Sequence, residues 1–114
     1  MKLLIAGTRK LNIMHVDVAA ALKEFQLEPT EIVSGGAQGP DQAAQIYGVR
    51  AELPTTIFYP GWEFHGKKAG ILRNIEMGKY ADQLLAFWDS KSRGTKHMID
   101  YMVELQKPCT VIYK

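Results

Sequence analysis

Two short glycine-containing segments carry the residue types that bind phosphate groups. The first, SGGAQGPD, covers residues 34–41, and the second, SRGT, covers residues 92–95. Glycine lets backbone N–H groups line a concavity and lets a ligand approach without meeting a Cβ atom. Gly39 and Pro40 also introduce a predicted helix, and a helix N-terminus carries partial positive charge. A plain strand-to-helix turn would use the same residues, so it is the second segment that favours a phosphate site.

The elements that must position these segments alternate between strands and helices. Short apolar runs predict strands at residues 2–6, 31–34, 53–60, 82–88 and 109–113. Apolar residues at helical spacing predict helices between them, at residues 18–27, 42–49, 66–81 and 96–106. This alternation predicts one α/β domain over residues 1–114, a Rossmann-like three-layer α/β/α fold around a five-stranded parallel sheet of order 3-2-1-4-5.

Ligands of such sheets bind beyond the carboxyl ends of the strands. Four loops should meet there, and they hold eight of the fourteen Lys and Arg residues of the chain: Arg9, Lys10, Lys67, Lys68, Arg73, Lys91, Arg93 and Lys96. The acidic residues of these loops are Asp41, Glu63 and Asp89. The resulting basic rim predicts an anionic ligand.

Composition sets the class of protein. The 114 residues are 46% hydrophobic and 23% charged, which argues against disorder. The net charge of +2 is small for a dedicated nucleic-acid binder. The segment MKLLIAGTR has too short an apolar run for a signal peptide or a membrane span, so we expect a cytoplasmic protein with no membrane partner. The single cysteine, Cys109, excludes an internal disulfide and is interpreted as a core residue of the last strand.

Common cofactor motifs are missing. The dinucleotide fingerprint needs G-x-G-x-x-G after the first strand, where this chain has GTRKLN, and the chain contains no P-loop motif. His65 and His97 have no second His or Cys at metal-ligand spacing. We therefore expect neither a cofactor nor a metal ion.

The segments GTR, SGGAQGPD, AGILRN, AFWD and SRGTKHMI together resemble the SLOG superfamily. This Rossmann-like group includes the LOG and Smf/DprA proteins, and the closest likeness is to its small YspA-like branch, whose function is unknown. The resemblance covers almost the whole chain. It implies a nucleotide or nucleotide-derived ligand between the two glycine loops. LOG members are phosphoribohydrolases, and DprA members bind single-stranded DNA.

The resemblance carries over to particular residues. Gly94 and Thr95 match the LOG pattern G-G-x-G-T-x-x-E, but Met98 stands where that pattern has its catalytic glutamate. A hydrolase would then need another carboxylate, with Asp41 and Asp89 as candidates. Arg73 matches the LOG arginine of M-x-x-R-K, and Arg73 with Asn74 matches the RN element of DprA.

The sequence thus favours a sensor or sequestering protein for a nucleotide-derived ligand. Backbone N–H groups of residues 35–39 and 93–95 would hold phosphate. Trp62 could stack on a base or pack in the core, whereas Trp88 is expected in the core. The predicted ligand-binding residues are Gly7, Thr8, Arg9, Ser34, Gly35, Gly36, Ala37, Gly39, Asp41, Trp62, Lys67, Arg73, Asn74, Ser92, Arg93, Gly94 and Thr95.

Two other functions remain open from the sequence. One is a nucleotide N-glycosidase or phosphoribohydrolase that uses Asp41 or Asp89, and the other is a single-stranded nucleic-acid-binding module.

The sequence also predicts that the protein forms oligomers. Ile71, Leu72, Ile75 and Met77 lie around more than one face of the helix at 66–81. A helix that is apolar on two sides needs a partner besides the sheet, so we expect a homodimer or a higher oligomer.

Overall fold

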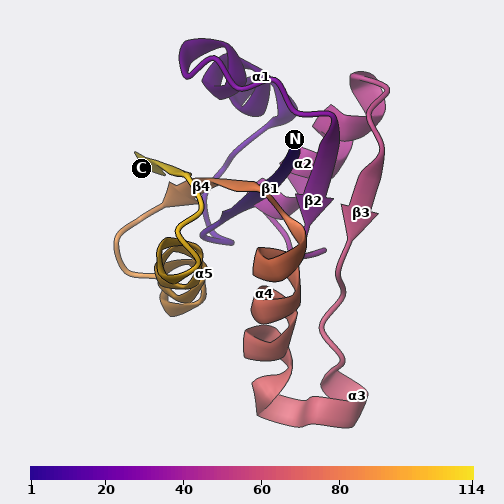
Figure 1. Cartoon of the computed structure of the whole chain (residues 1–114), viewed down its shortest axis with the longest axis vertical. Coiled ribbons are helices and arrows are strands. Elements are labelled where there is room, and N and C mark those ends of the chain that lie inside the picture. Colours follow the sequence, from indigo (N-terminus) through magenta and orange to yellow (C-terminus); the bar gives the residue numbers. More distant parts are fainter.

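The computed structural model describes the backbone of residues 1–114 and every side chain except that of Phe64. One parallel sheet runs through it in the order β3-β2-β1-β4-β5 (Figure 1). Its strands are β1 (Lys2–Gly7), β2 (Glu31–Ser34), β3 (Thr55–Ile57), β4 (Gln83–Trp88) and β5 (Cys109–Tyr113). The predicted Rossmann-like α/β fold and strand order are confirmed.

The helices cover both faces of the sheet. They are α1 (His15–Glu24), α2 (Pro40–Arg50), α3 (Trp62–His65), α4 (Ala69–Tyr80) and α5 (Arg93–Glu104), with a short 3-10 turn, η1, at Gly66–Lys68. Helices α1 and α2 pack on one face, and α4 and α5 pack on the other (Figure 1). The chain between β3 and α4, which includes α3, projects from one end of the body.

Two apolar cores lie on the two faces of the central strand β1. Leu3 and Ile5 pack against α1 and α2. Leu4 faces the other way and packs with Met77 of α4 and Met98 of α5. Because both faces of the strand are buried, its sequence is continuously apolar rather than alternating.

Strand β3 is shorter than predicted. The sequence predicts a strand over residues 53–60, but the strand covers only Thr55–Ile57. Its single neighbour, β2, ends at Ser34, where the glycine segment leaves the sheet, and the last strand register pairs Ser34 with Ile57. An edge strand can pair only along the length of its neighbour, so residues 58–60 leave the sheet.

The helix predicted over residues 66–81 is also corrected. A separate helix, α3, precedes it, and α4 begins only at Ala69. Gly66 follows α3 with a φ angle of 54°, a left-handed conformation that suits glycine and interrupts an α-helix. Helix α5 begins earlier than predicted because Ser92 caps it, with the Ser92 hydroxyl accepting a hydrogen bond from the Thr95 N–H.

Two further expectations concern the burial of Cys109 and the presence of membrane-spanning helices. Cys109 lies in β5 as predicted, but it is half-buried rather than fully buried because β5 is an edge strand. Within the described part of the chain, no helix has the length and apolar character needed to cross a bilayer.

Candidate functional site

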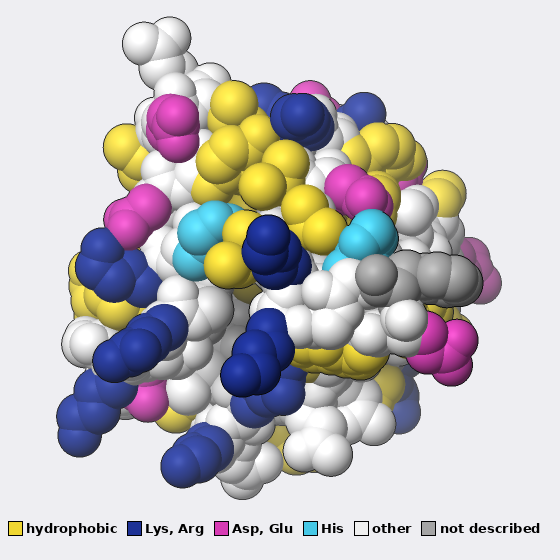
Figure 2. All heavy atoms as spheres, turned by 90° about the horizontal axis from the view of Figure 1, so that it is seen from below, with side chains coloured by type: hydrophobic (Ala, Val, Ile, Leu, Met, Phe, Trp, Pro, Cys, Tyr) yellow, Lys and Arg dark blue, Asp and Glu magenta, His cyan; other side chains and the backbone are white. Residues whose placement is uncertain are grey.

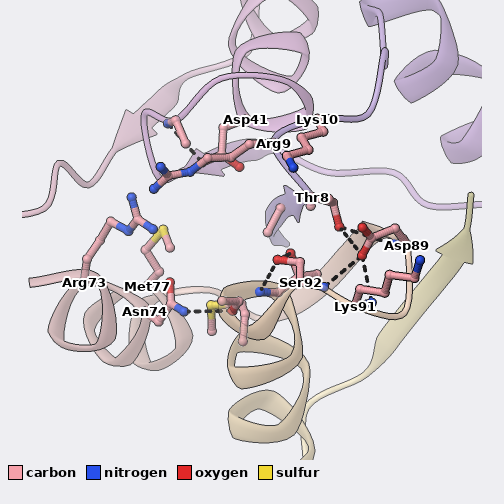
Figure 3. A pocket seen from close by; sticks show the side chains of 16 residues that line it. Thr8, Arg9, Lys10, Asp41, Arg73, Asn74, Met77, Asp89, Lys91 and Ser92 are labelled. Carbon is pink, nitrogen blue, oxygen red and sulfur yellow. Dashed lines mark hydrogen bonds between the residues drawn. The ribbon is translucent and has the colours of Figure 1, made fainter. Parts of the chain in front are cut away.

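A pocket of about 520 Å³ lies at the carboxyl edge of the sheet, where the predicted loops meet. Figure 3 shows side chains from the loops after β1, β2 and β4 and from α4 facing this pocket. Its lining includes ten of the predicted ligand-binding residues, namely Gly7, Thr8, Arg9, Ala37, Asp41, Arg73, Asn74, Ser92, Gly94 and Thr95, together with Asp89. The remaining lining residues are Ala6, Lys10, Met77, Lys91 and Met98.

Asp89 ties the loop after β1 to the loop after β4. Its Oδ1 atom accepts hydrogen bonds from the Lys91 and Ser92 N–H groups, both at 2.8 Å, and from the Thr8 hydroxyl at 3.1 Å (Figure 3). The two backbone N–H groups hold the pKa of Asp89 below its usual value. Asp89 is therefore an ionised group that fixes the shape of the pocket wall.

Asp41 and Arg73 flank the glycine segment after β2. The Ala37 N–H donates to Asp41 Oδ2 at 3.1 Å, and Arg73 Nη1 donates to the carbonyl oxygen of Gly35 at 2.9 Å. A Cβ atom on Gly35 would lie 2.9 Å from Asp41 Oδ2 and 3.2 Å from Arg73 Cζ. Glycine at this position thus allows a carboxylate and a guanidinium to approach the same residue.

The charged groups around Asp41 and Arg73 have shifted pKa values. Burial raises the pKa of Asp41, and the Ala37 N–H, Arg73 and Arg9 only partly oppose that effect. Burial also lowers the pKa of Arg73; Asp41 opposes this, and the charge of Arg9 adds to it. The Arg73 Nε atom is buried and has no hydrogen-bond partner among the described residues. A buried acid beside two arginines, one with an unused donor, is typical of binding and catalytic sites and makes this part of the pocket the candidate site.

Replacement of Asp41 by asparagine tests this electrostatic arrangement. Because the pKa of Asp41 is raised above 3.8 in the folded chain, the folded state holds the proton more tightly than the unfolded chain does. The contribution of Asp41 to stability is therefore fully present below its pKa in the unfolded chain. It is lost as the pH rises through the pKa of Asp41 in the folded chain. Asp41→Asn does not titrate, so its melting temperature relative to wild type should be higher at pH 7 than at about pH 4. If the melting temperature of Asp41→Asn relative to wild type fell with rising pH, that result would contradict the raised pKa of Asp41.

The glycines around the carboxyl edge of the sheet have different structural roles. A Cβ atom on Gly7 would lie 2.4 Å from the Phe87 carbonyl oxygen, and one on Gly39 would lie 2.7 Å from the Arg9 carbonyl oxygen. These two glycines are needed for packing. A Cβ atom on Gly94 would meet nothing within 4 Å, although Gly94 lines the pocket. A side chain at Gly94 would therefore enter open space that belongs to the pocket.

Several predicted ligand-binding residues do not line the pocket. Ser34 is fully buried, and its hydroxyl donates to the backbone carbonyl of Asp41 at 3.0 Å. Trp62 is half-exposed on α3, in the projecting segment, with its ring near Gly70. The others that lie outside the lining are Gly35, Gly36, Gly39, Lys67 and Arg93. Trp88, expected in the core, is half-buried and donates its ring N–H to the Ser92 carbonyl oxygen.

Five lining residues are missing from the predicted ligand-binding and catalytic residues, and three of them, Ala6, Met77 and Met98, are apolar. Lys10 follows Arg9, Lys91 lies between Asp89 and Ser92, and Met98 forms part of the pocket floor. Lys10 and Lys91 belong to the predicted basic rim, so their position in the strand-to-helix loops could have identified them as lining residues. Figure 2 shows Lys and Arg side chains gathered around a hollow of the surface. Across the residues whose placement is described, no cluster of three or more His, Cys, Asp or Glu side chains could hold a metal ion.

Fold and site together define a Rossmann-like α/β protein with a basic pocket at the carboxyl edge of its sheet. The chain is 45% identical to the Gene 61 protein of Mycobacterium phage D29 over 114 aligned positions, which cover 93% of this chain and 89% of the phage protein. It belongs to the family of that phage protein. No family model matches the chain, and no solved structure is significantly similar to it.

Proposed function

We propose that the pocket binds a nucleotide or a nucleotide-derived small molecule, and that the protein senses or sequesters this ligand in the cytoplasm. We also propose membership of the SLOG superfamily, on the motifs given above. The observation that carries the binding proposal is the pair Arg9 and Arg73. Their guanidinium groups face each other across one side of the pocket (Figure 3), and the charge of Arg9 contributes to the lowered pKa of Arg73. An anion between them would relieve that repulsion.

The rest of the lining narrows the ligand class. Ala6, Met77 and Met98 give the pocket an apolar floor beneath its charged rim. Asn74, Thr95 and Ser92 add polar groups around that floor. The volume of about 520 Å³ lies within the range of small-molecule sites, roughly 300–1,000 Å³, and far exceeds the needs of a phosphate ion alone. An anionic group joined to a flat, partly apolar ring matches this combination, and nucleotides have that chemistry.

Calorimetric titration with nucleoside monophosphates tests the proposal. We expect saturable binding of one ligand per chain for at least one base. The matching nucleoside and inorganic phosphate should each bind more weakly, because each fills only one part of the pocket. Equal affinity for phosphate and for every monophosphate would show that the base makes no contact and would contradict the proposal.

A second candidate function is hydrolysis of the N-glycosidic bond. It is favoured by the opposite environments of the two pocket aspartates, since the pKa of Asp41 is raised and that of Asp89 is lowered. Such a pair can supply a protonated acid and an ionised carboxylate. Chromatography after incubation with each monophosphate would then show free base, and Asp41→Asn would abolish its release. Catalytic release by wild type would replace the sensor proposal with this one.

We further propose a symmetric homodimer or higher oligomer formed through the projecting segment. Its exposed apolar side chains are Tyr59 and Trp62, and those of the adjoining first turn of α4 are Ile71 and Leu72, with exposed fractions of 70%, 50%, 51% and 36% in this order. Ile75 and Met77, which the sequence grouped with them, turn toward the body instead, because Met77 is buried and Ile75 is half-buried. Clustered exposed apolar side chains of this size mark interaction surfaces.

The mass in solution tests the assembly. Light scattering at micromolar concentration should give at least twice the chain mass of 12.8 kDa. Ile71→Glu should reduce the mass to that of one chain without loss of folding, since Ile71 is exposed in the single chain. Val103→Glu, at an exposed apolar position on α5, is the matched control and should leave the assembly intact. A wild-type protein of single-chain mass would exclude this interface.

A further inference from the structure

A second pocket lies on the other side of the loop that follows β1. Its volume is about 550 Å³, and it opens between the start of α1, the end of the glycine segment and the outer side of α2. Two of its residues, Arg9 and Lys10, also line the first pocket. The two pockets are therefore neighbours separated by these two basic residues.

The basic residues between the pockets are held in place by the backbone. They occupy the tip of a tight turn that the Leu11 N–H closes onto the Thr8 carbonyl oxygen at 3.1 Å. On the other side, Gly39 approaches so closely that a Cβ atom on it would lie 2.7 Å from the Arg9 carbonyl oxygen. The turn is thus fixed from both sides, while the side chains of Arg9 and Lys10 remain exposed.

The lining of the second pocket suits a ring with a polar edge. Met14 and Ile46 are large apolar side chains that remain 52% and 42% exposed. Gln38 and Gln42 are exposed beside them, and each carries an amide that can both donate and accept hydrogen bonds. Apolar side chains that cover a flat face, with amides at its edge, are the groups that bind a nucleobase.

We propose that the two pockets are halves of one site, and that its ligand is a dinucleotide, in which two base-bearing units are joined through phosphate. This inference rests on the proposed nucleotide-binding function and extends it. One unit occupies the first pocket over Met77 and Met98. The linking phosphate lies at Arg9 and Lys10, and the second base packs against Met14 and Ile46.

The expected signature is a gain in affinity from the second unit. A mononucleotide fills one pocket and leaves the apolar surface of the other exposed to water. A dinucleotide brings its second base to the second pocket at high effective concentration, so the added contacts cost little additional entropy. The gain should stop at two units, because the site consists of two pockets on either side of one turn.

Calorimetric titrations with 5′-phosphorylated oligonucleotides of increasing length test this inference. The probes are pA, pApA and an oligoadenylate of about ten nucleotides, with the corresponding uridylates as a second series. We expect the dinucleotide of one series to bind roughly tenfold or more tightly than its mononucleotide. Ile46→Ser should remove most of that gain and leave mononucleotide affinity unchanged. Val49→Ser is the matched control, because Val49 lies on the same helix, is exposed and does not line the second pocket.

The outcomes separate this inference from the function on which it rests. Mononucleotide binding with no gain from the second unit, or a gain that Ile46→Ser leaves intact, overturns the two-pocket site alone. Affinity that keeps rising up to the longest probe indicates a track for single-stranded nucleic acid and also overturns it. Absence of binding for all probes and for all nucleoside monophosphates removes the proposed function as well.

Discussion

Replacement of Arg73 by alanine is expected to weaken mononucleotide binding by about 1.5–3 kcal/mol, which is the contribution of a hydrogen bond to a charged group. Arg73 still has donors to offer, because only its Nη1 atom donates a hydrogen bond, to the Gly35 carbonyl oxygen, while its buried Nε atom has no partner among the described residues. Arg73→Lys should recover little of the loss, since lysine cannot present two parallel donors. Unchanged affinity in Arg73→Ala would exclude a phosphate clamp at this position.

The same variants should also change stability. From the sequence, a pure clamp would leave the melting temperature of the empty protein almost unchanged, whereas a salt bridge to Asp41 or Asp89 would lower it. Among the described residues no salt bridge joins Arg73 to either aspartate, but Arg73 does hold the glycine segment through Gly35. We therefore expect Arg73→Ala to lose about 1–2 kcal/mol of stability. Affinities should be measured well below the melting temperature, so that the loss of binding is not a loss of folded protein.

Alanine at Gly39 is expected to give the largest loss of stability, about 2–4 kcal/mol, from backbone strain and overpacking together. Gly39 has a φ angle of 70°, which side-chain-bearing residues rarely adopt. The added Cβ atom would also press against the Arg9 carbonyl oxygen at 2.7 Å. Chemical denaturation measures this loss, and a variant as stable as wild type would contradict the described loop.

Gly94→Ala is the matched variant with the opposite expectation. Its Cβ atom would have no neighbour within 4 Å, and Gly94 lies in the first turn of α5. Alanine should therefore raise stability by roughly 0.4–1 kcal/mol. Ligand affinity should nevertheless fall, because the methyl group enters the pocket. A variant with unchanged affinity would show that the ligand does not reach the start of α5.

The fold could be predicted from the sequence because buried parallel strands give unmistakable patterns. The continuous apolar runs at residues 2–6 and 82–88 became the adjacent central strands β1 and β4, and the alternation with helices predicted the parallel sheet. Element ends were harder to predict. Strand β3 ends where its neighbour β2 ends, so its limit depends on another strand. Helix α4 starts at Ala69 rather than at Gly66 as predicted, because the backbone of Gly66 is left-handed.

The site was predictable as a set of loops but not as a set of contacts. Topology brings the loop residues to one edge, and most of the predicted residues line the pocket. Ser34 could have been excluded, because alternate strand residues share a face and Ile32 packs into the core under α2. The hydrogen bond from the Arg73 side chain to the Gly35 carbonyl oxygen joins residues 38 positions apart, and no local sequence pattern indicates it.

The most direct test of the nucleotide-binding pocket is amide chemical-shift mapping by NMR, with increasing amounts of each nucleoside monophosphate and with inorganic phosphate as control. We predict saturable shifts for the N–H groups of the pocket-lining residues Ala37, Gly94 and Thr95, together with Thr8 and Arg9, and larger shifts at Met77 and Met98 for nucleotides than for phosphate. Shifts that fail to saturate, or that are scattered over exposed lysines away from the pocket, would contradict the account.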